Sequence, residues 1–169
     1  MHRSRWPIAL IAGLGILTIA CSEGDVVGPD RPAFSTVSAS GFLKCSVASS
    51  SSSSKYITPG KWDTLRVGPH RLIFQPQSLG AGTTITATVS TDSSRSVKFG
   101  PEGLTFKSGY EPNLQLSVQS CSSLASTDYI AFTDDKMSAV KEQRASSVDL
   151  IAKIISAKIS HFSRYAVHH

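Results

Sequence analysis

The chain has 169 residues, 40% of them hydrophobic, with a formal net charge of +5 and three cysteines. This composition excludes a disordered polyelectrolyte and a protein with many membrane spans, and it predicts one packed domain. No cluster of Lys or Arg interleaved with aromatic residues is present in the sequence, so nucleic acid is not an expected partner.

Residues 1–20 are typical of a secretory signal peptide. Arg3 and Arg5 precede an apolar and small-residue stretch that runs from Pro7 to Ala20. This stretch is too short for a membrane-spanning helix, which needs about 20 apolar residues. Removal of the signal peptide takes two of the seventeen basic residues away and leaves a net charge of +3.

The junction Leu17-Thr18-Ile19-Ala20-Cys21 resembles the bacterial lipobox, in which the cysteine is lipidated and becomes the new N-terminus after cleavage. The alternative is an ordinary signal peptide cut nearby, which would leave Cys21 as a free thiol. Because an unpaired exported thiol is a liability, we expect lipidation of Cys21. Ser22 after the cysteine resembles proteins sorted to the outer membrane, and residues 21–40 are expected to form a flexible tether.

Cys45 and Cys121 are the two cysteines that remain once Cys21 carries lipid, and an exported protein usually joins such a pair. Each lies at the edge of a β-like run, 42–47 and 114–121. A bridge between them would stabilise the fold by about 4 kcal/mol through the unfolded state. A redox or metal pair, the alternative, would have the short Cys-x-x-Cys spacing.

Residues 41–169 are predicted to form an all-β domain, a β-sandwich. Short runs of alternating or β-branched residues recur about every 10 to 15 residues, separated by Gly, Pro, Asp and Ser turns. Six consecutive serines, Ser49–Ser54, are interpreted as a mobile surface loop. The expected strands are 71–74, 83–89, 97–99, 104–106, 114–118 and 129–132.

The C-terminal third is ambiguous in its secondary structure. Apolar residues over 136–156 fit one face of a helix, and helix propensity permits it. The end of that stretch is rich in β-branched residues and fits a strand. We predict a hairpin-like pair of strands over 151–167 and leave helix and strand open for 136–149.

Three motifs in order resemble the ZU5 domain, in the form found in bacterial lipoproteins and surface proteins. They are Ile73–Leu79, Val97–Phe106 with its Phe-Gly-Pro-Glu-Gly-Leu-Thr-Phe sequence, and the closing run Ile159–Val167. The similarity covers about residues 60–168. It implies a β-sandwich that mediates contacts with other proteins.

The closing motif also raises one chemical hypothesis, at His161-Phe162-Ser163. In some ZU5-containing animal proteins, a His-Phe-Ser sequence is cleaved by the protein itself between Phe and Ser. The resemblance implies attack of the Ser163 hydroxyl on the Phe162 carbonyl, with His161 assisting proton transfer. The structural alternative, which we favour, places Phe162 in the core and the other two side chains outside it.

The remaining polar candidates indicate neither a catalytic site nor a metal site. Asp134-Asp135 lacks the spaced oxygen ligands of a calcium loop, which favours a solvated turn. His70 is interpreted as a surface residue at a strand edge. His168-His169 is interpreted as a frayed tail rather than a metal ligand pair. No cofactor is expected.

The leading hypothesis is therefore a non-enzymatic, lipid-anchored envelope protein whose domain contacts another envelope or extracellular protein. Self-cleavage at Phe162-Ser163 is the first alternative. Carbohydrate binding is the second, because Trp62 and Tyr110 could act as stacking platforms, although such aromatic residues more often border the core.

Overall fold

The computed structural model describes residues 41–46, 49–121 and 123–169, which belong to one compact unit. The predicted signal peptide, Cys21 and the tether lie outside these residues. Within them, no helix is long and apolar enough to span a membrane. The strands are β1 (Ser51–Ile57), β2 (Asp63–Val67), β3 (His70–Phe74), β4 (Thr83–Val89), β5 (Ser96–Gly100), β6 (Asn113–Ser117), β7 (Tyr129–Thr133), β8 (Val140–Gln143), β9 (Ser146–Asp149), β10 (Ile154–Lys158) and β11 (Arg164–His168).

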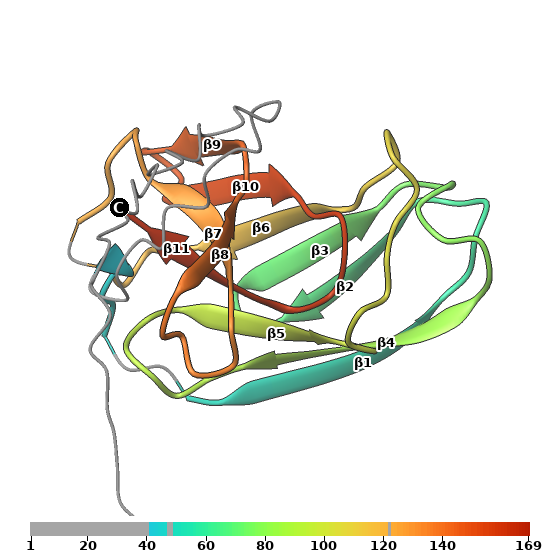
Figure 1. Cartoon of the computed structure of the whole chain (residues 1–169), viewed down its shortest axis with the longest axis horizontal. Coiled ribbons are helices and arrows are strands. Elements are labelled where there is room, and N and C mark those ends of the chain that lie inside the picture. Colours follow the sequence, from blue (N-terminus) through green and yellow to red (C-terminus); the bar gives the residue numbers. More distant parts are fainter. Residues whose placement is uncertain (1–40, 47–48, 122) are drawn as a thin grey trace, which may run out of the picture. The chain divides into compact units, whose positions relative to one another are not determined.

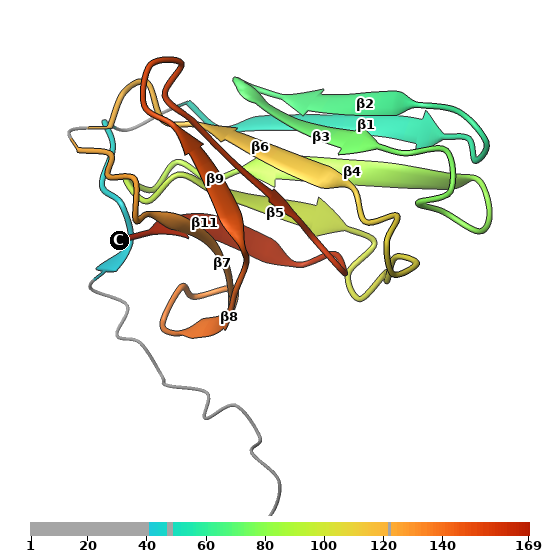
Figure 2. The same cartoon turned by 90° about the horizontal axis from the view of Figure 1, so that it is seen from above.

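The fold is all-β, and its strands form two antiparallel sheets (Figure 1 and Figure 2). One sheet has six strands in the order β1-β4-β5-β11-β7-β8. The other has five strands in the order β2-β3-β6-β10-β9. The predicted β-sandwich is thus confirmed.

The core lies between the sheets and follows the period of two that the sequence shows. In β4, Ile85, Ala87 and Val89 are buried, and Thr84, Thr86 and Thr88 on the other face are exposed. A second apolar cluster lies on β7, β8 and β11, where Phe42 packs against a small group of buried residues, namely Ala131, Val140 and Ala166. The central strand β11 is therefore buried on both faces.

The serine run was predicted to be a loop, and that prediction is wrong. Ser51–Ser54 form the first half of β1 and pair in register with Thr86–Val89 of β4. Serine has little intrinsic preference for strands, but the backbone ladder does not depend on the side chain. The β-favouring strand beside the serines supplies the partner groups, so the tertiary context overrides the local preference.

The predicted C-terminal hairpin is also wrong, although both strands exist. β10 pairs with β6 and β9 in the five-stranded sheet, and β11 pairs with β5 and β7 in the six-stranded sheet. The chain crosses between the sheets over residues 159–163, which lets each strand bury apolar side chains from opposite sides of the same core. Residues 136–149 contain strands β8 and β9 and no helix.

Two expected strands are reduced to isolated bridges. In the described part of the 42–47 run, Phe42 pairs with His168 and Cys45 pairs with Cys121. In the 104–106 run, only Thr105 forms a bridge, with His161. Both runs lie in segments that connect or cover the sheets.

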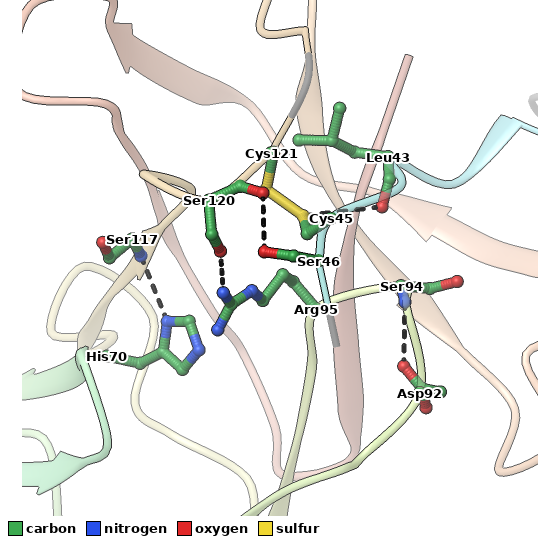
Figure 3. Close-up of a disulfide and its surroundings, with 10 residues drawn as sticks. All are labelled: Leu43, Cys45, Ser46, His70, Asp92, Ser94, Arg95, Ser117, Ser120 and Cys121. Carbon is green, nitrogen blue, oxygen red and sulfur yellow. Dashed lines mark hydrogen bonds between the residues drawn. A yellow bond between two sulfur atoms is a disulfide. The ribbon is translucent and has the colours of Figure 1, made fainter. Parts of the chain in front are cut away.

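Cys45 and Cys121 are joined by a disulfide (Figure 3). The bond links positions 76 residues apart in the chain and ties the first described segment to the loop after β6. Both cysteines are buried at the border of the main core. The disulfide therefore holds the N-terminal segment against the end of the sandwich.

His70 was predicted to lie at the surface, but its side chain is buried, with 1% exposed. Its Nδ1 atom accepts a hydrogen bond from the Ser117 backbone N–H at 3.1 Å. The Nε2 atom, which then carries the proton, has no hydrogen-bond partner among the described residues. Burial, helped by the nearby Arg95 charge (Figure 3), lowers the pKa of His70 to about 4.

This buried histidine predicts a loss of stability in mild acid. The pKa of His70 is lower in the folded protein, so the unfolded chain binds more protons between pH 6.5 and pH 4. The neutral His70 ring contributes to the free energy of unfolding above pH 6.5, and this contribution is lost as the pH drops toward 4. Its complete loss lowers the free energy of unfolding by about 3 kcal/mol. Denaturant unfolding of the wild type and of His70→Asn between pH 7 and pH 4 measures this fall.

In His70→Asn, we expect the free energy of unfolding to fall by about 3 kcal/mol less than in the wild type over this pH range. Asn does not titrate, and its side chain retains an acceptor for the Ser117 N–H. The matched control is His161→Asn, at a half-exposed histidine, which should keep the steep fall. Equal slopes for wild type and His70→Asn would contradict the assignment.

Candidate functional site

His161-Phe162-Ser163 does not lie in a strand but on the crossover between β10 and β11. Phe162 is buried, and His161 and Ser163 are half-exposed. The Phe162 ring stacks on Phe99, with centroids 5.5 Å apart, and meets the edge of Phe106 at 4.9 Å. The central residue of the motif is thus a core residue that both sheets surround.

The Phe162 backbone is bonded on both sides to a neighbouring segment. Its N–H donates to the Leu104 carbonyl at 2.7 Å, and its carbonyl accepts from the Gly103 N–H at 3.1 Å. Gly103 has a φ of +78°, a conformation that glycine adopts without strain. The Phe162 carbonyl, which a cleavage reaction would attack, therefore receives one backbone donor of the kind that stabilises an oxyanion.

The His161 ring contacts Glu142 and Phe132 and not the Ser163 hydroxyl. Its Nε2 lies 3.6 Å from Glu142 Oε2, and its ring packs edge-on against Phe132 at 4.7 Å. The Tyr165 hydroxyl donates to the His161 carbonyl at 2.7 Å, and burial raises the pKa of that hydroxyl. Within the described residues, no hydrogen bond joins His161 to Ser163, whereas a general base must come within hydrogen-bond reach of its nucleophile.

None of the three residues of the motif has a positive φ angle. Among the described residues other than glycine, positive φ angles occur at Met137 and Lys153, both outside the motif. A peptide strained toward attack would be expected to show such an outlier. The geometry of 161–163 therefore favours packing over self-cleavage.

The acidic pair Asp134-Asp135 is part of a turn with ordinary ionic contacts. Asp134 accepts hydrogen bonds from Ser138, and Asp135 Oδ2 lies 2.7 Å from Lys98 Nζ. The hydrogen bond from Lys98 lowers the pKa of the Asp135 carboxyl. Within the part of the chain that the structure describes, no three His, Cys, Asp or Glu residues gather as metal ligands would.

The two terminal histidines do not form a frayed tail, so that prediction is wrong. His168 is buried in β11 between two aromatic rings, Phe42 at 5.3 Å and Tyr129 at 5.1 Å. His169 Nδ1 lies 3.0 Å from the buried carboxylate of Asp128. The neighbouring strand β7 and the N-terminal segment supply these contacts, which the local sequence does not show.

Trp62 is exposed rather than at the border of the core, with 66% of the residue accessible. It lies beside an open groove of about 640 Å³ on the outer face of the five-stranded sheet. Tyr110 is not among the residues that line this groove; its ring lies under Lys107 Nζ at 5.1 Å. Of the two aromatic residues that the carbohydrate hypothesis combined, Trp62 lines the groove and Tyr110 does not.

Sequence reasoning missed two surface features. The free outer edge of β1 was not predicted, because its serines were interpreted as a loop. The turn between β9 and β10 exposes Leu150 and Ile151, which the sequence had placed on a predicted helix face or at the start of a hairpin. The only sequence signal for the exposed turn was the apolar pair Leu150-Ile151 itself.

No family model matches the chain, and neither a curated protein nor a solved structure matches it. The resemblance to the ZU5 domain therefore stays a prediction. The function is therefore inferred from the surfaces and contacts of the chain itself.

The geometry at the crossover predicts that the purified chain stays intact. Intact-mass measurement of the chain with Cys21→Ser should give one uncut species, because His161 is not aimed at the Ser163 hydroxyl. Ser163→Ala is the matched control and should give the same pattern. A product that ends at Phe162 and disappears in Ser163→Ala would overturn this expectation.

Proposed function

We propose that this protein is a non-enzymatic, lipid-anchored protein of the bacterial cell envelope that contacts another envelope protein through the free edge of β1. Lipid on Cys21 would hold it in the membrane, most simply the outer membrane. The tether 21–40 would give the sandwich freedom to reach its partner. The observation that carries the proposal is the open edge of β1.

β1 is the terminal strand of the six-stranded sheet and is seven residues long. A terminal strand presents unpaired N–H and C=O groups, to which an extended segment of another protein can add as a further strand. Exposed edges are usually protected by charge, proline, bulges or short length. Ser51–Ser54 have none of the first three protections.

The other three edges are better protected. β8 has four residues, with Lys141 and Glu142 among them, and its pairing register shifts between Phe132 and Thr133. β9 has four residues, and β2 has five, including Asp63 and Arg66. Strand addition is therefore most favourable at β1.

Lys55, the single charged residue of β1, does not protect the edge against strand addition. Lys55 Nζ lies 2.5 Å from Asp63 Oδ1 and 3.1 Å from the Thr64 carbonyl, so its ammonium group is directed to β2. Tyr56, the next residue, is 61% exposed. The edge thus offers an uncharged serine half for backbone pairing, and the Tyr56 side chain lies against Gly82 on the β4 side.

Photo-crosslinking in the native envelope tests this edge. A photoreactive residue at Ser52 or Ser54 should give a discrete protein adduct, because a strand added to β1 would lie within reach. The same residue at Lys107, in the connection between β5 and β6, is the control and should not give that adduct. With the photoreactive residue at Ser52, Ser54→Lys should abolish the adduct by placing charge on the edge; recovery of lipid adducts alone would contradict the proposal.

A second candidate function, carbohydrate binding, is favoured by the groove at Trp62. Amide and hydroxyl groups from four strands or their ends line it beside the indole ring, namely Gln75, Asn113, Ser147 and Ser156. An exposed indole offers an apolar face for the C–H face of a sugar, and neutral polar groups bind its hydroxyls. The groove lining contains one charged residue, Lys158, and no carboxylate.

Binding to a glycan array distinguishes this candidate. Trp62→Ala should lower binding at least tenfold if the indole provides the stacking surface. Tyr56→Ala removes an exposed aromatic residue that does not line the groove and should leave binding unchanged. An array without signal for the wild type, or equal loss in both variants, would reject the groove as a sugar site.

Self-cleavage at Phe162-Ser163 is the weakest of the three candidates. The N–H of Gly103 on the Phe162 carbonyl is the observation in its favour. The partners of His161 and the burial of Phe162 favour a structural role.

A further inference from the structure

The turn between β9 and β10 displays two branched apolar side chains to solvent. Ile151 is 98% exposed and Leu150 is 51% exposed. Tight turns usually contain Gly, Asn, Asp or Ser because these residues suit the backbone angles and the contact with water. Here Leu150-Ile151-Ala152 occupies the turn, so an apolar tip stands where polar residues would be the ordinary choice. We call residues 150–152 the apolar tip.

The apolar tip is held in place by its own backbone contacts. Asp149 Oδ1 accepts hydrogen bonds from the N–H groups of Ile151, at 3.0 Å, and Ala152, at 2.8 Å. Lys153 closes the turn with a φ of 51°, a conformation more usual for glycine or asparagine. Ile151 is thus presented outward by an ordered turn and cannot fold back onto the sheet without breaking these bonds.

The apolar tip lies at the same end of the sandwich as Gly41, the first described residue. The Lys153 carbonyl accepts a hydrogen bond from the Val118 N–H at 2.9 Å, and Val118 precedes Cys121 by three residues. Cys121 is bonded to Cys45, just after the first described residues. Figure 2 shows the β9–β10 turn and the segment that begins at Gly41 at the same end of the sheets.

Basic side chains lie at the same end of the sandwich as the apolar tip. Lys153 and Lys44 are exposed, and Lys44 Nζ lies 3.1 Å from Ser94 Oγ. Arg95 is half-buried and contacts Ser120, close to the disulfide. Arg66 and Arg71 are paired across β2 and β3, one residue from the turn that joins these strands. Five cationic groups therefore lie at this end of the domain, and one of them, Lys153, belongs to the turn itself.

The acidic groups at this end are fewer and are engaged by N–H donors or by histidine. Asp149 accepts the two bonds of the tip, and Asp92 Oδ1 accepts from the Ser94 N–H at 3.0 Å. The Asp128 side chain is fully buried beside His169. Within the turn Asp149 and Lys153 balance, but five basic side chains against three carboxylates leave this end of the domain with a net positive charge, which suits an anionic lipid surface.

We propose that the apolar tip inserts into the anionic phospholipid surface of the membrane in which the protein is anchored, with lysines and arginines of the same end on the headgroups. This inference rests on the proposed lipid anchor at Cys21. The twenty residues from Cys21 to Ser40 could extend up to roughly 70 Å. The tether therefore permits the domain to leave the membrane, and tip insertion would be the contact that brings this end down onto the bilayer.

The first experiment measures the tip without the anchor. Both core clusters lie within residues 42–167, so a processed chain that starts at residue 21 keeps the folded domain. With Cys21→Ser, this chain carries no lipid and is mixed with vesicles of phosphatidylethanolamine and phosphatidylglycerol. We expect a measurable partition that Leu150→Ser/Ile151→Ser lowers about tenfold or more, because two aliphatic side chains lose their burial.

The matched control is Tyr56→Ser/Trp62→Ser, which removes two exposed apolar side chains elsewhere on the domain and should leave the partition unchanged. Added salt should weaken the partition through screening of the basic groups. Equal partition of the wild-type and tip-variant domains, or no partition of the wild-type domain, overturns the proposal. A change in the sedimenting mass of the tip variant without vesicles would also overturn it and would assign the tip to contact with a second copy.

The second experiment reports on the tip directly. An environment-sensitive dye on Ile151→Cys, in the chain with Cys21→Ser, should shift to shorter wavelength on these vesicles. The same dye on Ser54→Cys, in β1, should not shift; equal spectra at the two positions overturn the proposal. Acyl groups on Cys21 of the native protein are measured separately by mass, so loss of the anchor hypothesis is distinguishable from loss of the tip hypothesis.

Discussion

The fold depends on two connections that cross between the sheets and bond to each other. The chain passes from β5 to β6 over residues 101–112 and from β10 to β11 over 159–163. Backbone hydrogen bonds join the two connections along their length, from Ile159 N–H on the Pro112 carbonyl to Gly103 N–H on the Phe162 carbonyl. Phe106 and Phe162 fill the space between them. Because both sheets contribute a strand end to each connection, this contact fixes how one sheet lies on the other.

That constraint explains why the His-Phe-Ser motif suits a structural role. The backbone groups of Phe162 are satisfied by the facing connection, and its ring completes an aromatic cluster with Phe99 and Phe106. Movement of the Phe162 carbonyl toward a nucleophile would disturb these contacts together. The crossings also occupy the end of the sandwich opposite Gly41 and the β9–β10 turn (Figure 2). The β1 edge and the Gly41 end, proposed for protein and membrane contact, lie away from this contact, whereas the groove at Trp62 adjoins it through Asn113 and Lys158.

The Cys45–Cys121 disulfide stabilises the end of the sandwich that contains Gly41 and the β9–β10 turn. It links the segment that follows the tether to the loop after β6, and the same loop bonds to Lys153 at the base of the apolar tip. A protein held by lipid on Cys21 would therefore present an end that carries both apolar and basic side chains to its membrane. The β1 edge runs along the side of the sheet and would stay open to a partner. Under these proposals, membrane contact and protein contact use different surfaces.

The sequence by itself determined the class of fold and most strands, because alternation such as Ile85, Ala87 and Val89 is a local property that one buried face imposes. It also indicated the cysteine pair, since few cysteines remained to be joined. Only the tertiary structure decided that the serines of β1 form a strand, that β10 and β11 belong to different sheets, and that His70 and His168 are buried. Each of these outcomes depends on a partner distant in the chain, such as β4 for the serines or Ser117 for His70. Local periodicity cannot encode such partners, because backbone pairing and burial are supplied by the neighbouring element and not by the residue itself.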